Sequence, residues 1–371
     1  MKIGVPKEIK IHENRVGLTP TSVRELVVHG HQVMVQKNAG LAIDLDDSRY
    51  QAAGAEIVES AEEIYARAEL IVKVKEPQST ELGLLRAGQI LFTYLHLAPD
   101  PEQTEGLLES GCIAIAYETV TDAYGGLPLL APMSEVAGRM AVQAGAHALE
   151  MDQGGRGILL GGVSGVPSAK VVILGGGVVG TNAARVAMGM EAHVTVIDKS
   201  IHRLQQLDLQ YGSRINTVFS TVDAIEEQVV VADLVIGAVL IPGAATPRLV
   251  THALVKKMNR GSVLVDVAVD QGGCFATSRP TSLAKPIYVL DDVVHYCVPN
   301  MPGAVARTST FALNNVTLPF VLAIAEKGGK MALIGDPHLR NGLNVYEGQI
   351  THPAVAHDLG ILYVNPMELL Q

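Results

Sequence analysis

The stretch "KVVILGGGVVGTNAARVAMGMEAHVTVID", residues 170–198, decides the fold. Residues 171–174 are a short, mostly β-branched run, which is typical of a buried parallel strand. Gly175, Gly177 and Gly180 follow with the spacing G-x-G-x-x-G, and the small residues after them predict a helix. A G-x-G-x-x-G that lies between a strand and a helix is typical of a dinucleotide-binding βαβ unit.

Each glycine of this fingerprint answers a different physical demand. Gly175 permits the tight turn, Gly177 lets the backbone approach a pyrophosphate, and Gly180 lets the helix pack closely on the strand. The start of the helix would offer free N–H groups and a positive dipole end to the phosphates. The alternative is a glycine-rich turn without a ligand, and the strand and helix on either side argue against it.

The residue that ends the next strand predicts which dinucleotide binds. Asp198 follows strand 193–197, at the usual distance from the glycines. Its carboxylate can accept hydrogen bonds from a ribose diol and would repel a 2′-phosphate, so the sequence favours NAD over NADP. Lys199 and Arg203 lie close by, and their positive charges oppose this preference.

The alternating pattern continues beyond Asp198. Further strands are predicted at 216–219, 234–239, 263–267 and 287–290, separated by amphipathic segments at 201–211, 222–230 and 247–258. For the last of these, Thr246 is the expected N-cap and Pro247 the expected first residue. Six strands alternating with helices describe a complete doubly wound dinucleotide-binding domain.

The first third of the chain alternates in the same way but has no glycine fingerprint. Strands are predicted at 2–5, 32–36, 70–74, 90–95 and 113–117, and helices at 21–29, 61–68 and 100–110. Two helices, 134–150 with Ser134 as N-cap and 308–326, would connect the two halves. The last forty-odd residues would return to the first half.

The predicted fold class is therefore α/β, with two Rossmann-like doubly wound domains, mostly parallel sheets and a cleft between them. The expected boundaries are 1–130 plus 308–371 for a discontinuous substrate domain, and 131–307 for the NAD-binding domain.

Composition excludes several classes of protein. The net charge of −10 argues against nucleic acid as a partner, because phosphates would be repelled. Cys112, Cys274 and Cys297 form no CxxC pair, so neither a disulfide framework nor a zinc site is expected, and no other ligand cluster suggests a metal. The N-terminus lacks the apolar core of a signal peptide. The chargeless stretch 308–325 contains polar residues such as Asn314 and is expected to be a buried helix, so a cytoplasmic protein without membrane contact is predicted.

Several chemically active side chains fall at predicted strand exits. Arg15 lies on the loop after the first strand, and Lys75, His96, Glu118 and Asp270 each end or follow a later strand. In open α/β sheets, ligands bind beyond the carboxyl ends of strands. Each residue also has a structural explanation: Lys75 and Glu118 as solvated charges or a supporting partner, His96 as a structural histidine, and Asp270 as the cap of the following turn. Their common location favours a site.

Six motifs carry a resemblance that spans essentially the entire chain. They are "MKIGVPKEIKIHENRVGLTP", "VKVKEP", "YLHLAPD", "LGGGVVGTNAA", "VDVAVDQGG" and "VPNMPGAVARTST". Together they resemble the NAD-dependent bacterial alanine dehydrogenases, a family related to the nucleotide-binding first domain of the transhydrogenase alpha subunit. The resemblance implies reversible oxidative deamination of L-alanine to pyruvate and ammonia, NAD as cofactor, and a homo-oligomer, usually a hexamer.

The resemblance also implies roles for individual residues. Arg15 and Lys75 would bind the substrate's carboxylate and carbonyl, and His96 and Asp270 would be the catalytic pair. Imidazole suits repeated proton transfer, a carboxylate can stabilise an iminium charge, and the planar guanidinium fork matches a carboxylate. Tyr94, Met133 and Asn300 would shape a small pocket together with Met301, although packing is the competing interpretation for both methionines.

The expected cofactor contacts lie at strand ends, at the start of the fingerprint helix and at the domain junction. They are Ser134, Gly175, Gly177, Val178, Val179, Gly180, Asp198, Lys199, Arg203, Ser220, Val239, Leu240, Val267, Asp270 and Met301.

Two alternative functions remain open from the sequence. A transhydrogenase component would pass hydride between nucleotides and need a membrane partner, but it would leave His96 and Asp270 without a substrate. A non-catalytic NAD-binding module would bind the cofactor without turnover, and it gives no reason for Arg15, Lys75 and His96 to share strand ends.

Overall fold

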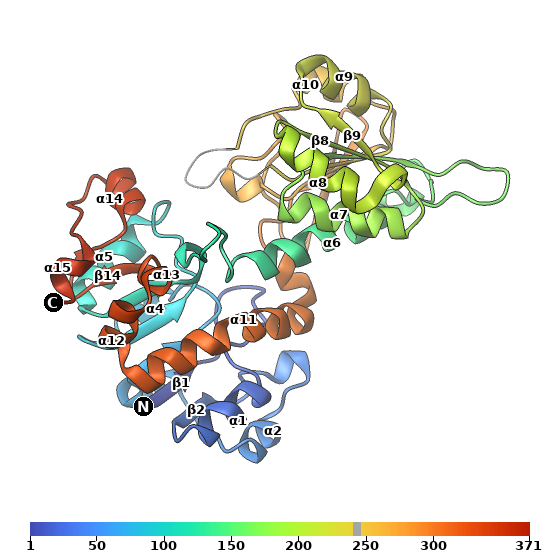
Figure 1. The fold of residues 1–371 in the computed structure, drawn as a ribbon. Helices are drawn as coiled ribbons and strands as arrows, with labels where there is room; N and C mark the ends of the chain where they lie inside the picture. Colours follow the sequence, from blue (N-terminus) through green and yellow to red (C-terminus); the bar gives the residue numbers. More distant parts are fainter. Residues whose placement is uncertain (240–245) are drawn as a thin grey trace. The chain divides into compact units, whose positions relative to one another are not determined.

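The computed structural model describes residues 1–239 and 246–371, so the expected cofactor contact Leu240 lies outside the described residues. The chain divides into two compact units (Figure 1). The first comprises Met1–Met133 and Val305–Gln371, and the second comprises Ser134–Ala304. Each unit has its own β-sheet.

The first unit is built on an eight-stranded sheet with the order β15-β14-β6-β5-β4-β1-β2-β3. Neighbouring strands are parallel from β6 to β3, whereas β14 pairs antiparallel with β6 and β15 with β14. The strands are β1 (Lys2–Val5), β2 (Gln32–Gln36), β3 (Glu56–Val58), β4 (Leu70–Val72), β5 (Ile90–Thr93), β6 (Ile113–Ala116), β14 (Leu343–Tyr346) and β15 (Gln349–Ile350).

The helices of this unit begin at side-chain caps in several places. Thr19, Asp46, Ser60 and Asp100 each accept a backbone N–H from the first turn of the helix that follows. The helices are α1 (Pro20–Val28), η1 (Leu41–Ile43), α2 (Asp47–Ala52), α3 (Ala61–Arg67), α4 (Ser79–Leu82), α5 (Pro101–Ser110), η2 (Tyr117–Thr119), α11 (Ala306–Lys327), α12 (Gly329–Gly335), α13 (Pro337–Arg340), α14 (Pro353–Leu359) and α15 (Pro366–Leu369).

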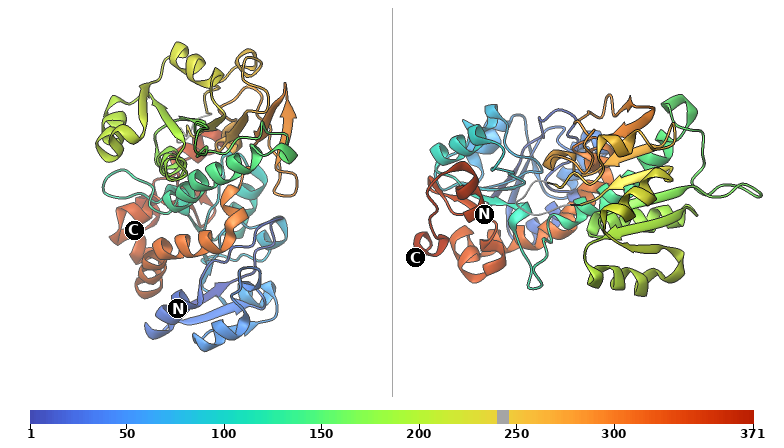
Figure 2. Two further views of the ribbon diagram at one scale, coloured as in Figure 1. Left: turned by 90° about the vertical axis from the view of Figure 1, so that its right-hand side faces the viewer. Right: turned by 90° about the horizontal axis from the view of Figure 1, so that it is seen from above.

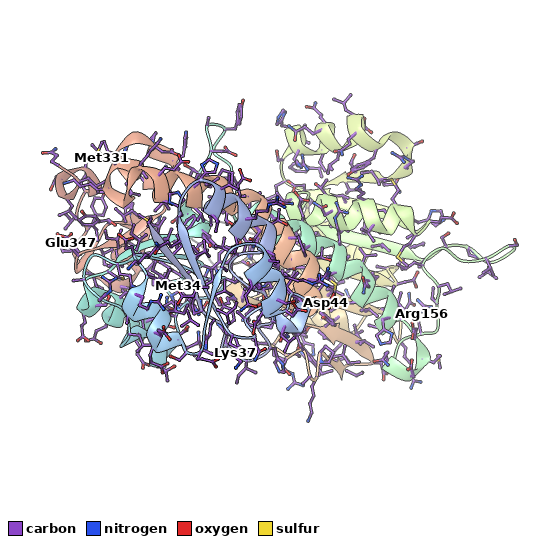
Figure 3. The ribbon with its side chains drawn as sticks, turned by 90° about the horizontal axis from the view of Figure 1, so that it is seen from below. Met34, Lys37, Asp44, Arg156, Met331 and Glu347 are labelled. Atoms are coloured by element: carbon purple, nitrogen blue, oxygen red, sulfur yellow. The ribbon has the colours of Figure 1, made fainter. Side chains whose placement is uncertain are left out.

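Both faces of the first sheet are buried. In β4, Leu70 and Val72 belong to a core shared with α1 and α11, whereas Ile71 belongs to a second core shared with α3, α5 and α14. Met34 of β2 lies in this second core, and Lys37 just after the strand is exposed and pairs with Glu59 (Figure 3). Helices on both faces of a mostly parallel sheet define a doubly wound unit.

Helix α11 has polar side chains that are bonded within the first unit. The segment Met301–Lys327 is long and apolar enough to cross a membrane, and among the described residues it is the one such candidate. The side chain of Asn314 accepts hydrogen bonds from Thr19 N (2.7 Å) and Ser22 Oγ (3.0 Å) and donates one to Gly17 O (3.2 Å). These bonds tie α11 to the loop before α1, in agreement with the expected buried helix.

The second unit is built on a seven-stranded sheet with the order β12-β13-β11-β10-β7-β8-β9. All neighbouring strands are parallel except β12, which forms an antiparallel hairpin with β13. The strands are β7 (Lys170–Leu174), β8 (His193–Asp198), β9 (Asn216–Phe219), β10 (Leu234–Gly237), β11 (Val263–Asp266), β12 (Ile287–Leu290) and β13 (Val293–Tyr296). The helices are α6 (Ala131–Ala148), which begins in the first unit, then η3 (Met151–Gln153), α7 (Val178–Gly189), α8 (Ile201–Tyr211), η4 (Gly212–Arg214), α9 (Val222–Val230), α10 (His252–Val255), η5 (Val269–Gln271) and η6 (Met301–Val305).

The second sheet is also buried on both faces. In β7, Val171 and Ile173 belong to a core shared with α6 and α7, and Val172 and Leu174 belong to a core shared with α9 and α10. The alternation along a single strand places helices on both faces of this sheet as well.

A long loop, residues 154–168, projects from the second unit and is drawn in green in Figures 1 and 2. It turns back at an antiparallel bridge between Val163 and Val166. The side chains of Leu159, Val163 and Val166 are 67%, 59% and 58% exposed. We call residues 154–168 the arm.

The predicted elements differ from the structure in a few places. Strands β3, β13, β14 and β15 were not predicted: β3 and β15 are very short, and buried polar residues, His295 in β13 and Asn344 in β14, interrupt the apolar pattern. The predicted helix 247–258 was wrong at its start, because Thr251, and not Thr246, caps α10 with a bond from Leu254 N (3.2 Å). Likewise α6 begins at Ala131, so Ser134 lies in its first turn and is not the N-cap.

Candidate active site

The glycine-rich turn after β7 has the geometry that a dinucleotide requires. Gly175 adopts φ +100°, a left-handed conformation, and a Cβ on it would lie 2.8 Å from Ala238 O. A Cβ on Gly180 would lie 1.8 Å from Gly175 O, so only glycine permits this approach of helix to strand. A Cβ on Gly177, by contrast, would meet nothing within 4 Å, which leaves that side of the turn accessible. Gly177 also precedes α7, whose first N–H groups suit a phosphate.

Asp198 is joined directly to this turn. Its carboxylate accepts hydrogen bonds from Gly176 N (2.6 Å) and Ser200 N (2.7 Å) at the end of β8. Arg203 donates to Gly176 O through Nε (2.5 Å) and also to Thr181 Oγ1. The guanidinium therefore supports the turn from α8, while Lys199 is exposed. These residues fit a dinucleotide whose pyrophosphate approaches Gly177 and whose ribose approaches Asp198.

The other expected cofactor contacts divide into accessible and buried groups. Val178 is 45% exposed, but the side chain of Val179 is only 8% exposed and packs in the core, so its backbone alone could face a ligand. Ser220 follows β9 and donates its N–H to Asp198 O (3.0 Å). Val239 follows β10, and Val267 donates its N–H to Gly237 O (3.0 Å) at the same edge of the sheet.

Asp270, Asn300 and Met301 lie on two connections of the second unit. Asp270 is an exposed residue of η5, which follows β11. Asn300 is half-buried and accepts a bond from Gly303 N (3.0 Å) in the turn before helix α11. Met301 is 1% exposed in the core of the second unit, which favours the packing interpretation for this side chain.

In the first unit, one edge of the sheet collects the predicted substrate residues. Strands β6, β5, β4 and β1 are parallel neighbours, so their carboxyl ends lie together. Glu118 follows β6, Tyr94 and His96 follow β5, Lys75 follows β4, and Arg15 lies on the loop after β1.

Arg15 is a buried cation that is oriented by a carboxylate and faces a thioether. The residue is 2% exposed, and its Nε and Nη2 donate to Glu13 Oε1 (2.7 Å) and Oε2 (2.5 Å). Its Nη1 lies 3.1 Å from Met133 Sδ. Burial lowers the pKa of Arg15, but the hydrogen bonds and charge of Glu13 outweigh this and raise it overall. The sequence predicted the guanidinium fork for substrate, whereas the structure gives its Nε–Nη2 edge to Glu13.

Lys75 is held at the end of β4 by its backbone. Its N–H donates to Glu8 Oε1 (3.3 Å), and its carbonyl accepts from Thr93 Oγ1 (2.9 Å). Its side chain is 15% exposed, with Nζ 4.0 Å from Glu76 Oε2. Burial lowers the pKa of Lys75, and the charge of Glu76 opposes this only in part. The neighbouring Lys73 is fully buried and pairs with Glu8 (3.4 Å) and Glu81 (2.6 Å), which makes it structural.

His96 is held in a strained backbone conformation. It adopts φ +51°, which is uncommon for a residue other than glycine. Glu118 stabilises this turn, because its Oε1 accepts N–H bonds from Leu95 (3.1 Å) and His96 (2.6 Å). The imidazole stacks on Tyr94 with ring centroids 5.9 Å apart and remains 45% exposed. Tyr94 is fixed in turn by a bond from its hydroxyl to Leu129 O (2.6 Å).

Sequence reasoning missed the acidic residues that support these groups. Glu8 and Glu13 lie in the quoted loop "VPKEIKIHENR", where acids alternate with basic residues. That alternation is a signal for local ion pairing, but it does not say which cation each carboxylate meets. Both carboxylates turn out to be buried beside the predicted substrate residues.

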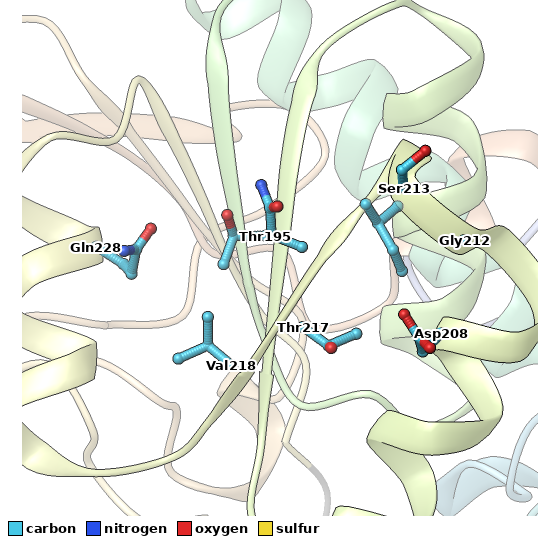
Figure 4. A pocket seen from close by; sticks show the side chains of 9 residues that line it. Thr195, Asp208, Gly212, Ser213, Thr217, Val218 and Gln228 are labelled. Atoms are coloured by element: carbon cyan, nitrogen blue, oxygen red, sulfur yellow. The ribbon is translucent and has the colours of Figure 1, made fainter.

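The described residues show no metal-binding cluster, and the depression beside strand β9 is not lined by the candidate site residues. Within residues 1–239 and 246–371, no group of three or more His, Cys, Asp or Glu residues could hold a metal ion. An open depression of about 440 Å³ lies beside the edge strand β9 (Figure 4). The residues that line it include Thr195, Asp208, Thr217 and Gln228. None of the candidate site residues lines it.

Comparisons with known proteins agree over the whole chain. Models of the alanine dehydrogenase/PNT family match residues 4–137 with the N-terminal domain and residues 141–353 with the C-terminal domain. The chain is 60% identical over 370 residues to an alanine dehydrogenase of Halomonas elongata, with 100% of both chains covered. It is 53% identical over 372 residues to the alanine dehydrogenase of Bacillus subtilis, covering 100% of this chain and 98% of that one.

Solved structures give the same result. A structure of L-alanine dehydrogenase matches with a TM-score of 0.94 and 54% identity, covering 97% of this chain and 99% of that chain. A transhydrogenase structure from Sinorhizobium meliloti matches with a TM-score of 0.82 and 24% identity, covering 95% and 100%, and shares the fold.

The fold and the glycine-rich turn of the second unit define a dinucleotide-binding α/β protein of the Rossmann type, and Arg15, Lys75 and His96 lie at neighbouring strand ends of the first unit. Within that class, the chain belongs to the alanine dehydrogenase/PNT family.

Proposed function

We propose that the protein is an NAD-dependent L-alanine dehydrogenase, which catalyses the reversible oxidative deamination of L-alanine to pyruvate and ammonia. Full-length relatives that are 50–60% identical support this function. The strongest structural support is the cluster of Arg15, Lys75 and His96 at neighbouring strand ends of the first unit.

The second unit would hold the cofactor. Gly175, Gly177 and Gly180 would cradle the pyrophosphate, and Asp198 would accept hydrogen bonds from the adenosine ribose. Bound NAD would supply one piece of chemistry, the acceptance of a hydride from the substrate's Cα. The remaining steps concern protons and charges that the chain's own residues would hold.

Arg15 and Lys75 would bind the anionic end of the substrate. Because Glu13 occupies the Nε–Nη2 edge of the guanidinium, we place the substrate carboxylate on the Nη1 side of Arg15. Lys75 would donate to the carbonyl oxygen of pyruvate or to the carboxylate. Met133, which contacts Nη1, and Tyr94 would limit the space for the substrate's side chain.

His96 would transfer protons during the reaction, and Asp270 would stabilise the positive charge on the substrate nitrogen. In the deamination direction, the alanine ammonium loses a proton, water is deprotonated as it attacks the imine carbon, and the departing nitrogen is protonated. Nδ1 or Nε2 of the half-exposed His96 imidazole could accept and return these protons. The carboxylate of Asp270 would hold the nitrogen or the water and stabilise the iminium charge.

A direct test of this function is a spectrophotometric scan of NADH oxidation with ammonia and a panel of 2-oxo acids. We expect rapid oxidation with pyruvate and much slower oxidation with larger 2-oxo acids. Hydride transfer from NADH to a second nucleotide without pyruvate would instead favour the transhydrogenase alternative. NADH binding with no oxidation in any mixture would favour a non-catalytic module.

We also propose that the protein is a cytoplasmic homo-oligomer, a hexamer by family resemblance. The arm supports self-association, because three aliphatic side chains on a projecting loop are more than half exposed. Exposed apolar side chains that cluster on a projection are favourable contacts for a second copy of the chain.

A further inference from the structure

The loop that carries Asp270 is fastened on both sides of that residue to one buried carboxylate, that of Asp266. Asp266 is the last residue of β11 and is 0% exposed. Its Oδ1 accepts from Ala268 N (3.2 Å), which precedes Asp270. Its Oδ2 accepts from Cys274 N (2.9 Å) and from the hydroxyl of Ser278, both of which follow Asp270. One side chain therefore gathers the two ends of the segment 268–278.

The loop approaches the Asp266 carboxylate closely at Gly273, where a side chain would not fit. Gly273 adopts φ +80°, and a Cβ there would lie 2.6 Å from Asp266 Oδ2. The turn between is closed by bonds from Gln271 N (3.0 Å) and Gly273 N (3.1 Å) to Ala268 O. Asp270 thus lies in a short turn whose start and end are both anchored.

Packing alone does not account for a carboxylate at this position. Burial raises the pKa of Asp266, whereas the hydrogen bonds from Ser278 and from the backbone of the loop lower it. A buried carboxyl group carries a desolvation cost that an apolar residue would avoid. The groups that donate hydrogen bonds to Asp266 belong to the loop 268–278. These bonds offset the desolvation of the carboxylate and fix the conformation of the loop.

We propose that Asp266 is a positioning residue for the reaction: it holds the η5 turn so that the carboxylate of Asp270 stays where the substrate nitrogen and water react. This inference rests on the proposed function, because it requires a catalytic role for Asp270. Asp266 itself would not touch the substrate. A displacement of about 1 Å in a reacting group can lower a rate by roughly 100-fold.

The test compares Asp266→Asn with Asp233→Asn in the full-length enzyme. The amide keeps the size of Asp266 but turns an N–H₂ group toward backbone N–H donors. Asp233 is a matched control in the same unit: it is 8% exposed, accepts from Lys170 N (2.8 Å) and pairs with Arg156 (2.8 Å), which Figure 3 labels. It supports the opposite ends of β7 and β10, away from Asp270.

For Asp266→Asn we expect kcat for pyruvate amination to fall about 10- to 100-fold, with an NADH Kd within about twofold of wild type by fluorescence titration. The pH profile of kcat should also change, because the turn that carries Asp270 would no longer be held by the Asp266 carboxylate. Asp233→Asn should keep the wild-type kcat and pH profile, even if its urea midpoint is lower. An Asp266→Asn enzyme with wild-type kcat would overturn the inference. Equal losses of kcat and NADH affinity would indicate general unfolding, and the decision would then rest on the milder variant Ser278→Ala.

Two further variants keep the test decisive. If Asp266→Asn does not fold, Ser278→Ala removes a single donor and should lower kcat about two- to fivefold, whereas an unchanged kcat would contradict the proposal. Asp270→Asn distinguishes the catalytic role of Asp270 from the positioning role of Asp266. If Asp270→Asn is fully active, the proposed function of Asp270 fails; if it is inactive while Asp266→Asn is unaffected, only the positioning inference fails.

Discussion

At the scale of single residues, the candidate substrate site consists of charges that the fold has partly removed from water. Arg15 is almost fully buried yet paired with Glu13, and Lys75 is mostly buried at a strand end. Such groups interact strongly with an incoming anion because water screens them weakly. The orientation of Arg15 by Glu13 also means that the cation is in place before any ligand arrives.

Arg15→Lys should weaken substrate binding more than the retained charge suggests. A lysine ammonium cannot donate two parallel bonds to the Glu13 carboxylate and still present a donor toward Met133, so the lysine would lose this orientation. We expect the KM for pyruvate to rise about 10- to 100-fold, consistent with the ~1.5–3 kcal/mol of a charged hydrogen bond. Steady-state kinetics measure this, and an unchanged KM would exclude the carboxylate role of Arg15.

Lys75 gives a prediction about pH. Its pKa lies below the ordinary value of 10.5, because burial disfavours the ammonium form. The positive charge is therefore lost as the pH rises through that lowered pKa, and pyruvate binding should weaken in this alkaline range. Lys75→Arg stays protonated there, so its KM should not rise over the same range. The comparison is made with saturating ammonia and NADH; identical KM profiles for the two enzymes would count against the role.

Sequence alone could predict which residues lie at strand ends but not how they are held. Arg15, Lys75 and His96 follow apolar runs that are legible as strands, so their shared edge could be inferred. The pairing of Glu13 with Arg15 and the left-handed conformation of His96 depend on loop paths that no periodicity encodes. The catalytic and binding roles of these residues remain predictions.

At the scale of secondary-structure elements, the β7–turn–α7 unit carries the cofactor prediction. Its pattern was the most legible in the sequence, because each glycine has a separate steric reason. Short strands such as β3 and β15, and strands with buried polar residues such as β13 and β14, gave no comparable pattern. The predicted start of helix α10 was too early, because Val250 forms a β-bridge with Phe275 and the residues immediately before it are not helical.

Gly180→Ala tests the packing of this element. A Cβ at position 180 would lie 1.8 Å from Gly175 O, so α7 or the glycine turn must shift. We expect NADH affinity to fall at least tenfold and the unfolding free energy to fall by about 2–4 kcal/mol, as for overpacked sites. Fluorescence titration and urea unfolding measure the two effects.

The last residue of the same helix provides the control. A Cβ on Gly189 would meet nothing within 4 Å, and its φ is not in the left-handed region. Gly189→Ala should therefore leave NADH binding unchanged and alter stability by no more than about 1 kcal/mol. Equal effects of the two substitutions would contradict the steric argument for Gly180.

At the scale of the whole molecule, the two units have different proposed roles. The first unit collects the groups that suit a small anionic substrate, and the second carries the dinucleotide turn and Asp270. Sequence periodicity predicted two mostly parallel sheets, and the structure and its relatives agree with that class. The oligomeric state could not be read from composition, because it depends on which exposed surfaces match.

The arm allows a test of the proposed self-association. Val163→Asp places a charge among the exposed aliphatic side chains of the arm, and we expect it to reduce the molecular mass in solution, measured by light scattering after gel filtration. Leu209→Asp in α8 is the control, since that side chain is 87% exposed but lies outside the arm. A monomeric wild-type protein would contradict the homo-oligomer proposal, and an unchanged mass for Val163→Asp would exclude the arm as its interface.

The central claim is that His96 of the first unit transfers protons in a reaction for which the second unit binds the cofactor and supplies Asp270. The most direct measurement compares turnover and NADH binding in His96→Ala and in His357→Ala, whose imidazole lies in the same unit and is 88% exposed. Loss of a general acid–base should lower kcat about 10²- to 10⁴-fold. We predict that loss for His96→Ala, with NADH Kd within about twofold of wild type and with full activity in His357→Ala. A His96→Ala enzyme that turns over at close to the wild-type rate would contradict the account.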